Sequence, residues 1–258
     1  IEEAIRLWNF DNLCVGCGDC VAACPTGALA MTDSEGPRID HDRCTRCGEC
    51  VDLCVRNAMA LDGFVIDSQT LIARLTADTV FFNSSGGGVP FSGGDPLRQT
   101  DFVAVVADAL RDRGIHTAVE TSMCGPWENL LTLIGCIDFF HVDLKILNAD
   151  GHREATGMGN GAILGNFIRL AERLRGSGRL LVRIPLVPGY TADTDALRDL
   201  VAYVASIDPD LPIELMNFNP LAAAKYRRMR LPFALADVAT AFSDDEMDRA
   251  YAAVGISG

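Results

Sequence analysis

Positive charge is scarce in this 258-residue sequence. Lys and Arg together number 22 against 35 Asp and Glu, which gives a formal net charge of -13. Proteins that bind DNA, RNA or anionic membranes meet the phosphate groups with clustered Lys and Arg. The acidic balance therefore argues against nucleic-acid and anionic-lipid partners.

Long apolar runs are also missing from the sequence. No stretch approaches the roughly 18 consecutive apolar residues that a membrane-spanning helix needs, because Asp, Arg or Gly interrupts the longest runs. We therefore expect no membrane partner. The sequence begins with Ile1 rather than methionine, so we expect that the natural N-terminus lies outside it and that a signal peptide cannot be judged from it.

Cysteine, in contrast, is abundant, and eight of the ten cysteines form two runs with the spacing CxxCxxCxxxC. A loop with ligands at every third residue wraps one corner of an iron-sulfur cube, and the fourth cysteine of each run reaches the other cluster. We therefore predict two 4Fe-4S clusters. The predicted ligands are Cys14, Cys17, Cys20 and Cys54 for the first cluster, and Cys44, Cys47, Cys50 and Cys24 for the second.

Structural zinc and disulfide bonds are the alternatives for these cysteines. Zinc usually takes two separated pairs of ligands and has no role for a third cysteine at the same spacing. Gly16, Gly18 and Gly48 favour clusters, because backbone near sulfide must turn tightly and present its N–H groups. Thiolates that bind clusters must stay reduced, so we expect a cytoplasmic protein.

The pattern of apolar residues divides the sequence near Asp62 and Gly63. Residues 1–62 are rich in cysteine, whereas residues 63–258 alternate strand-like with helix-like segments. This alternation predicts an α/β fold, with a parallel sheet or barrel whose chemistry lies at the carboxyl ends of the strands. The expected strands lie within residues 86–94, 116–121, 137–145, 180–187 and 212–218.

Several short motifs follow the cysteine runs in a fixed order. They are GGGVPFSGGDPL, GIHTAVETS, DLK, RIPLVPGY and AAAKY. Together with the cysteine runs, from about Leu13 to Tyr226, they resemble the glycyl-radical enzyme activating enzymes. This branch of the radical S-adenosylmethionine (SAM) superfamily carries a two-cluster ferredoxin insert. The resemblance implies a partial radical SAM (β/α) barrel with a small ferredoxin-like domain, in an oxidoreductase that cleaves SAM reductively to install a glycyl radical on a partner enzyme.

The resemblance also implies where SAM binds. The main chain of Gly93 and Gly94 would approach its amino group, and Asp95 stands where the family usually has glutamate. Within the DLK motif, Leu144 would lie beside the cofactor, and Lys145 and Arg183 would lie beside its methionine carboxylate.

A monovalent cation near SAM is a further implication of the resemblance, with Glu120, Thr121 and Asp143 as its ligands. Two other interpretations stay open at this point. Asp143 and Lys145 would also suit a plain salt bridge at a strand end, and Arg183 a structural contact with carboxylates. We expect His141 to be structural.

One family motif is absent from these 258 residues. Family members hold a catalytic 4Fe-4S cluster with cysteines spaced CxxxCxxC in a loop after the first barrel strand, and this spacing does not occur here. We therefore expect a longer parent protein with a third 4Fe-4S cluster, of which this chain lacks the first strand and the cluster loop. On its own the chain is predicted not to cleave SAM.

Partners follow from the same resemblance. They are a glycyl-radical enzyme as protein substrate and a low-potential flavodoxin or ferredoxin as electron donor. The absent motif leaves one alternative, in which the chain is a two-cluster ferredoxin-type electron-transfer protein on a degenerate, non-catalytic barrel.

Overall fold

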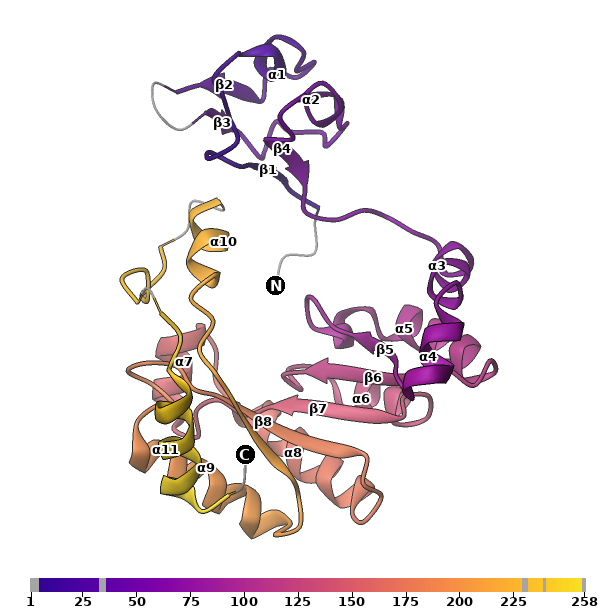
Figure 1. Ribbon diagram of the computed structural model, residues 1–258, viewed down its shortest axis with the longest axis vertical. Helices are drawn as coiled ribbons and strands as arrows, with labels where there is room; N and C mark the ends of the chain where they lie inside the picture. The colour runs from indigo at the N-terminus through magenta and orange to yellow at the C-terminus, as the bar shows by residue number, and fades with distance from the viewer. Residues whose placement is uncertain (1–4, 33–35, 229–231, 239, 257–258) are drawn as a thin grey trace. The chain divides into compact units, whose positions relative to one another are not determined.

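The computed structural model describes residues 5–32, 36–228, 232–238 and 240–256. Ile1, on which the expectation of a missing N-terminal segment rests, lies outside the described residues. The chain forms two compact units (Figure 1). The first unit comprises residues 1–66 and 220–238, and the second comprises residues 67–219 and 239–258.

Within its described residues, the first unit contains two short antiparallel strand pairs and three short helices. Strand β1 (Leu7–Asn9) pairs with β4 (Met59–Leu61), and β2 (Leu29–Met31) pairs with β3 (Pro37–Ile39). The helices are α1 (Asp19–Ala22), α2 (Glu49–Asp52) and α10 (Ala222–Arg228). Leu7, Leu29, Cys50 and Met59 form its small buried core, so cysteines supply part of the packing themselves.

The second unit contains one parallel sheet whose strands follow the order of the sequence. The strands are β5 (Gly88–Phe91), β6 (His116–Thr121), β7 (Phe139–Asp143), β8 (Leu180–Pro185) and β9 (Ile213–Met216). Among the described strands, β5 and β9 have a single neighbour each. The predicted α/β class with five parallel strands is confirmed, and each strand falls within its expected range.

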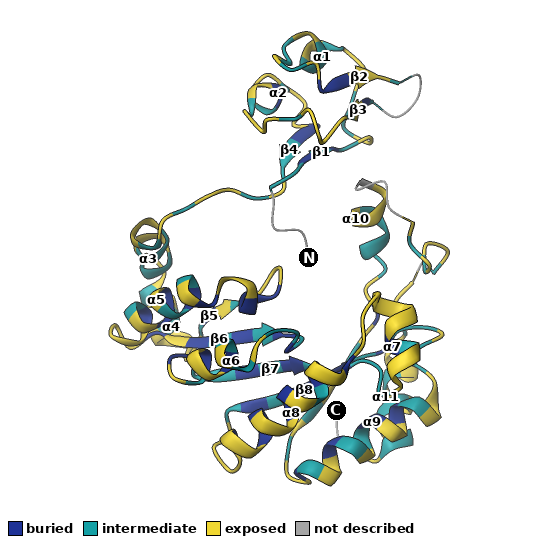
Figure 2. Ribbon diagram, turned by 180° about the vertical axis from the view of Figure 1, so that it is seen from behind, coloured by how far each residue is buried: buried dark blue, intermediate teal, exposed yellow. Residues whose placement is uncertain are grey.

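Helices α3 (Ser68–Thr76) and α4 (Thr79–Ser85) precede the first strand of the sheet, and α11 (Asp244–Val254) follows the last. The helices between the strands are the 3-10 helix η1 (Pro96–Gln99), α5 (Thr100–Arg111), α6 (Trp127–Ile134), α7 (Ala149–Thr156), α8 (Gly161–Leu174) and α9 (Thr194–Ile207). Helices α5, α6, α8 and α9 cover one face of the sheet (Figure 2). Val119, Phe140 and Val182 point from the strands into the core under these helices. No helix within the described part of the chain is long and apolar enough to cross a membrane.

Two local features differ from the expectations. The continuous helix expected over residues 66–82 is two helices, because the helical path breaks at Asp78, where the Thr79 hydroxyl donates to the carbonyl oxygen of Thr76. The boundary between the units falls after Ile66 rather than near Asp62, and Asp67 caps the first turn of α3 by accepting from the main-chain N–H of Thr70.

Candidate functional site

The cysteines of the second run surround a hollow in the first unit. Cys44, Cys47 and Cys50 line this hollow, and the fourth cysteine on its wall is Cys24, from the first run. This is the exchange of ligands that the spacing predicts for a two-cluster ferredoxin. The arrangement fits a 4Fe-4S cluster held by these four thiolates.

Main-chain donors support the last cysteine of each run. The N–H of Ala28 points at the Cys24 sulfur at 3.2 Å, and the N–H of Ala58 points at the Cys54 sulfur at the same distance. Each donor follows a left-handed residue, Gly27 at φ 60° or Asn57 at φ 51°. Such N–H groups stabilise the negative charge of a cluster-binding thiolate.

The spacing of the cysteines favours clusters over zinc. A zinc site has no role for a third cysteine at the same spacing, whereas each thiolate of a cube binds a different iron. Burial raises the pKa of the Cys50 thiol to about 11, so a cation is needed to keep it deprotonated at neutral pH.

The second unit gathers charged side chains on the sheet face opposite the helices, called here the inner face. Register places Glu120 beside His141, Asp143 beside Arg183, and Arg183 beside Glu214. Because successive side chains on a strand alternate between faces, these five residues share the face opposite the buried core. The structure thus brings Glu120, Asp143 and Arg183 together on one face of the sheet.

Arg183 is the centre of this charged row. Its guanidinium lies 2.9 Å from Glu120 Oε1 and 3.7 Å from Glu214 Oε2, and its side chain is only 12% exposed. The Ser92 hydroxyl donates to Glu120 Oε2 at 2.7 Å, and this bond together with Arg183 lowers the pKa of Glu120. Glu120 is therefore ionised and oriented at neutral pH.

His141 and Asp143 leave polar atoms unused on the same face. His141 Nδ1 and Asp143 Oδ1 are buried without a hydrogen-bond partner. Burial, and then the charge of Arg183, lowers the pKa of His141, so its ring is neutral at neutral pH. The second oxygen of Asp143 pairs with Lys145 at 3.2 Å. Unsatisfied buried atoms of this kind point toward a polar ligand.

Asp95 is fully engaged within the protein. Its side chain accepts from the Thr121 hydroxyl at 2.8 Å, from the Ser122 N–H at 3.0 Å and hydroxyl at 2.6 Å, and from the Leu97 N–H at 3.2 Å. The carboxylate thereby joins the loop after β5 to the end of β6. Thr121 turns its hydroxyl to this contact and away from Glu120 and Asp143, so its side chain does not join the inner face.

Gly93 and Gly94 form the exposed turn ahead of Asp95. Gly93 has φ 112°, a conformation that side chains disfavour, and an added Cβ there would meet no atom within 4 Å. The main chain at this turn is accordingly open to approach by a ligand. Leu144, in contrast, is 1% exposed, and its N–H donates to the carbonyl oxygen of Arg183, so its side chain belongs to the core.

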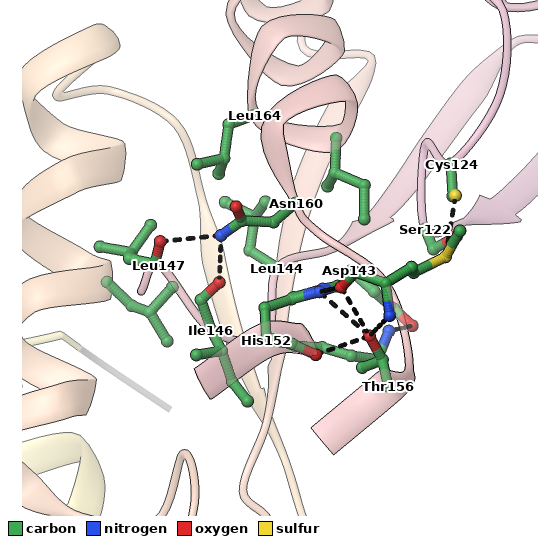
Figure 3. A pocket seen from close by; sticks show the side chains of 14 residues that line it. Ser122, Cys124, Asp143, Leu144, Ile146, Leu147, His152, Thr156, Asn160 and Leu164 are labelled. Atoms are coloured by element: carbon green, nitrogen blue, oxygen red, sulfur yellow. Dashed lines mark hydrogen bonds and ion pairs between the residues drawn. The ribbon is translucent and has the colours of Figure 1, made fainter. Parts of the chain in front are cut away.

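A cavity of about 130 Å³ lies beside Asp143 and Lys145 (Figure 3). Two polar side chains that line it already have hydrogen-bond partners within the protein. His152 Nδ1 lies 2.7 Å from the carbonyl oxygen of Met158, and the Asn160 side chain donates to the carbonyl oxygens of residues 146 and 147. These bonds fix the loop that follows β7. The cavity therefore borders the DLK motif, but it offers few polar groups that are free to bind a ligand.

Sequence reasoning missed Ser92, His141 and Glu214 as members of the inner face. Their strands were predicted, and alternation along β6 already puts Thr121 opposite Glu120. The neighbours across the sheet depend on register, which the local sequence does not reveal. His141, expected to be structural, has instead a free polar atom on the inner face.

Comparison with protein families and solved structures gives consistent matches. The model of the 4Fe-4S dicluster domain matches residues 13–58. A solved domain of the pyruvate-formate lyase-activating enzyme from Bacteroides vulgatus ATCC 8482 aligns with a TM-score of 0.50 at 25% identity. The alignment covers 67% of this chain and 99% of that domain.

Curated relatives are similar over most of the chain. The benzylsuccinate synthase activating enzyme of Thauera aromatica is 37% identical over 86% of this chain and 68% of its own length. The indoleacetate decarboxylase activating enzyme of Tractidigestivibacter scatoligenes is 30% identical over 87% of this chain and 73% of its own length. The 4-hydroxyphenylacetate decarboxylase activating enzyme of Clostridioides difficile strain 630 is 32% identical over 86% of this chain and 70% of its own length.

Proposed function

This chain belongs to the family of glycyl-radical enzyme activating enzymes, and from that membership we propose that the inner face of its sheet is the SAM site. The observation that carries the proposal is the charged row centred on Arg183, with free polar atoms on His141 and Asp143. Family membership favours an activating enzyme over the ferredoxin-type electron-transfer alternative.

Reductive cleavage of SAM supplies the radical that removes a hydrogen atom from a glycine of the partner enzyme. The residues of this chain bind and orient the substrate for that step. The open turn at Gly93 lets main-chain groups reach the amino group of SAM, and Lys145 and Arg183 carry the positive charge that suits its carboxylate. Asp95 holds this turn against the end of β6 and acts as a positioning residue.

A monovalent cation at the same site is a second part of the proposal. Glu120 and Asp143 present carboxylate oxygens on the inner face, and hard cations prefer oxygen ligands. The hydroxyl of Thr121 is directed at Asp95, so only its main chain is left for this role. Leu144 contributes through its backbone, because its side chain is buried.

We further propose that the first unit holds two 4Fe-4S clusters, with the exchanged ligand sets predicted above, and that these 258 residues hold no third cluster. The match to the dicluster domain and the hollow lined by Cys24, Cys44, Cys47 and Cys50 support the first part. The absence of a CxxxCxxC motif supports the second part. The 258-residue chain by itself is therefore expected not to cleave SAM.

The partner and the electron donor are proposed by class. The partner is a glycyl-radical enzyme, and because the 37% identical relative is named for benzylsuccinate synthase, that enzyme is the first to assay. The donor is a low-potential flavodoxin or ferredoxin. Because the thiolates that bind clusters must stay reduced, we propose a reducing, cytoplasmic environment.

The test uses protein produced without oxygen from the natural coding sequence, reduced and mixed with SAM and the partner. We expect 5'-deoxyadenosine and a glycyl-radical signal in electron paramagnetic resonance (EPR). The variant Arg183→Met removes the charge at the centre of the row and should weaken SAM binding. Arg173→Met, at an exposed position of α8, is the matched control. Unchanged SAM binding by Arg183→Met would contradict the proposed site.

A further inference from the structure

The two cysteine runs of the first unit are copies of one structural repeat. Residues 14–31 and 44–61 each place a left-handed glycine before a short helix, Gly18 at φ 83° and Gly48 at φ 87°. Each repeat then turns through a second left-handed residue and ends in a strand, β2 or β4. Position by position comparison of the two cluster environments is therefore meaningful.

The first cysteine loop differs in charge between the repeats. Arg46 stands between Cys44 and Cys47 and lines the hollow formed by the second ligand set. The equivalent position in the first repeat is Gly16. Both residues adopt the left-handed conformation, at φ 60° and φ 72°, although this conformation is costly for arginine and free for glycine. The second repeat thus retains a strained arginine where glycine would fit better.

The turn after the fourth cysteine differs in hydrogen bonding. The Thr26 hydroxyl lies 3.6 Å from the Cys24 sulfur and donates to it when that sulfur is a thiolate. Arg43 donates to the main-chain carbonyl oxygen of Thr26 at 2.6 Å, which fixes this turn and adds a second positive charge beside it. In the first repeat, Leu13 occupies the place of Arg43.

Charges outside the hollow act in the opposite sense. Arg56 occupies the place of Thr26 in the turn after Cys54, so a positive charge also lies near the ligands of the first cluster. In the second run, the exposed Asp42 and Asp52 stand where the first run has Asn12 and Ala22. Among the residues that line the hollow of the second ligand set, Arg46 is charged and none is acidic, so the side chains nearest to this cluster favour its reduction.

Charge and hydrogen bonds at a cluster determine how readily it accepts an electron. Reduction adds one negative charge to the cluster, so a nearby cation and a donor to a ligand sulfur both favour the reduced form. We propose that the cluster held by Cys24, Cys44, Cys47 and Cys50 has the higher reduction potential of the two, and that Arg46 and Thr26 set the difference. This inference rests on the two-cluster assignment made above.

The experiment measures both reduction potentials in the full 258-residue chain, loaded with clusters without oxygen. Dithionite supplies one electron to each cluster, no bond breaks, and EPR follows each step against the applied potential. The wild-type chain should show two separate steps. Arg46→Gly introduces the residue that its conformation favours, and it should shift the higher step to lower potential. Thr26→Val should act in the same direction, and Thr26→Ser should restore the wild-type value.

A charge-matched control lies in the other repeat. Arg56→Ala removes one positive charge near the first cluster, so the lower of the two reduction potentials should fall further. The higher potential should not change, and the difference between the two potentials should increase. The exchange of Gly16→Arg with Arg46→Gly should narrow or reverse the gap. An added Cβ at Gly16 meets no atom within 4 Å, so there is space for the new side chain.

Ionic strength separates the effect of the Arg46 charge from the effect of the Thr26 hydrogen bond. Arg46 is exposed, so the shift in Arg46→Gly should shrink as salt rises, whereas the shift in Thr26→Val should not. The inference is overturned if Arg46→Gly and Thr26→Val leave the higher step in place, or if they move the lower step. Failure of the two-cluster assignment looks different: the chain would bind fewer than eight irons, the content of two clusters of four.

Discussion

Replacement of Asp95 by asparagine tests whether this carboxylate ties the turn at Gly93 and Gly94, proposed to bind SAM, to the sheet. The carboxylate is 9% exposed and accepts four hydrogen bonds, two on each oxygen. Asparagine has the same shape, but one oxygen becomes an NH2 group that can only donate. The substitution therefore changes hydrogen bonding and charge with little change in packing.

The expected magnitude follows from the donors around the carboxylate. Each oxygen faces one main-chain N–H, that of Leu97 or that of Ser122, and an N–H cannot reverse its role. In either orientation of the asparagine amide, one N–H loses its acceptor, and the hydroxyl beside it must turn to accept from the new NH2 group. The other N–H and the other hydroxyl donate to a neutral oxygen. A hydrogen bond to a charged group contributes about 1.5 to 3 kcal/mol, so Asp95→Asn should cost about 2 to 4 kcal/mol of unfolding free energy.

Two measurements check this value. Urea unfolding of the second unit gives the free energy, and amide hydrogen exchange should show faster exchange at Leu97 and Ser122. The control Asp199→Asn removes an exposed carboxylate on α9 and should change stability by less than about 0.5 kcal/mol. If Asp95→Asn costs no more than this control and leaves exchange unchanged, Asp95 does not tie the turn to β6.

Three further predictions concern charge and iron. Ser92→Ala should raise the pKa of Glu120, because it removes the hydroxyl that stabilises the carboxylate. NMR titration of the Glu120 carboxyl carbon measures this pKa, and an unchanged value would refute the role of Ser92. Because the pKa of Glu120 is lowered by folding, its contribution to stability is present above its usual pKa of about 4.3 and is lost at lower pH. The pKa of His141 is also lowered, so the stability of the second unit should fall as the pH drops below about 6.5. His141→Gln should remove part of that loss, and an identical pH profile in the variant would contradict this. Finally, the purified 258-residue chain, loaded with its two clusters of four irons, should form no 5'-deoxyadenosine from SAM; product above a control lacking the cluster cysteines would show that the catalytic ligands are misplaced.

Features that depend on nearby residues could be predicted from the sequence. The bounds of β6, His116 to Thr121, can be predicted because apolar and polar side chains alternate along a half-buried strand. The cysteine runs also predicted which four cysteines surround the hollow. The ligand spacing is visible within each run, and in two-cluster ferredoxins the fourth cysteine of a run binds the other cluster.

Features that depend on distant residues could not be predicted in the same way. Glu214 joins Arg183 only because β8 and β9 pair in one register, and the sequence around either strand does not specify that register. Asp95 carried a proposed role in cofactor binding from the family pattern, yet its partner Ser122 is 27 residues away. The family pattern indicates the chemistry that a motif provides, whereas the contacts of each side chain depend on the tertiary structure.

The reciprocal position of Cys24 has a consequence for how the first unit matures. Because Cys24 lies in the first repeat and lines the hollow of the second, the second repeat does not by itself supply the four ligands proposed for its cluster. Iron and sulfide can therefore complete this cluster only when both repeats are present, and binding of the cluster would help to hold the two repeats together. Loss of Cys24 alone would accordingly damage the cluster of the other repeat, so the two repeats form one unit of assembly.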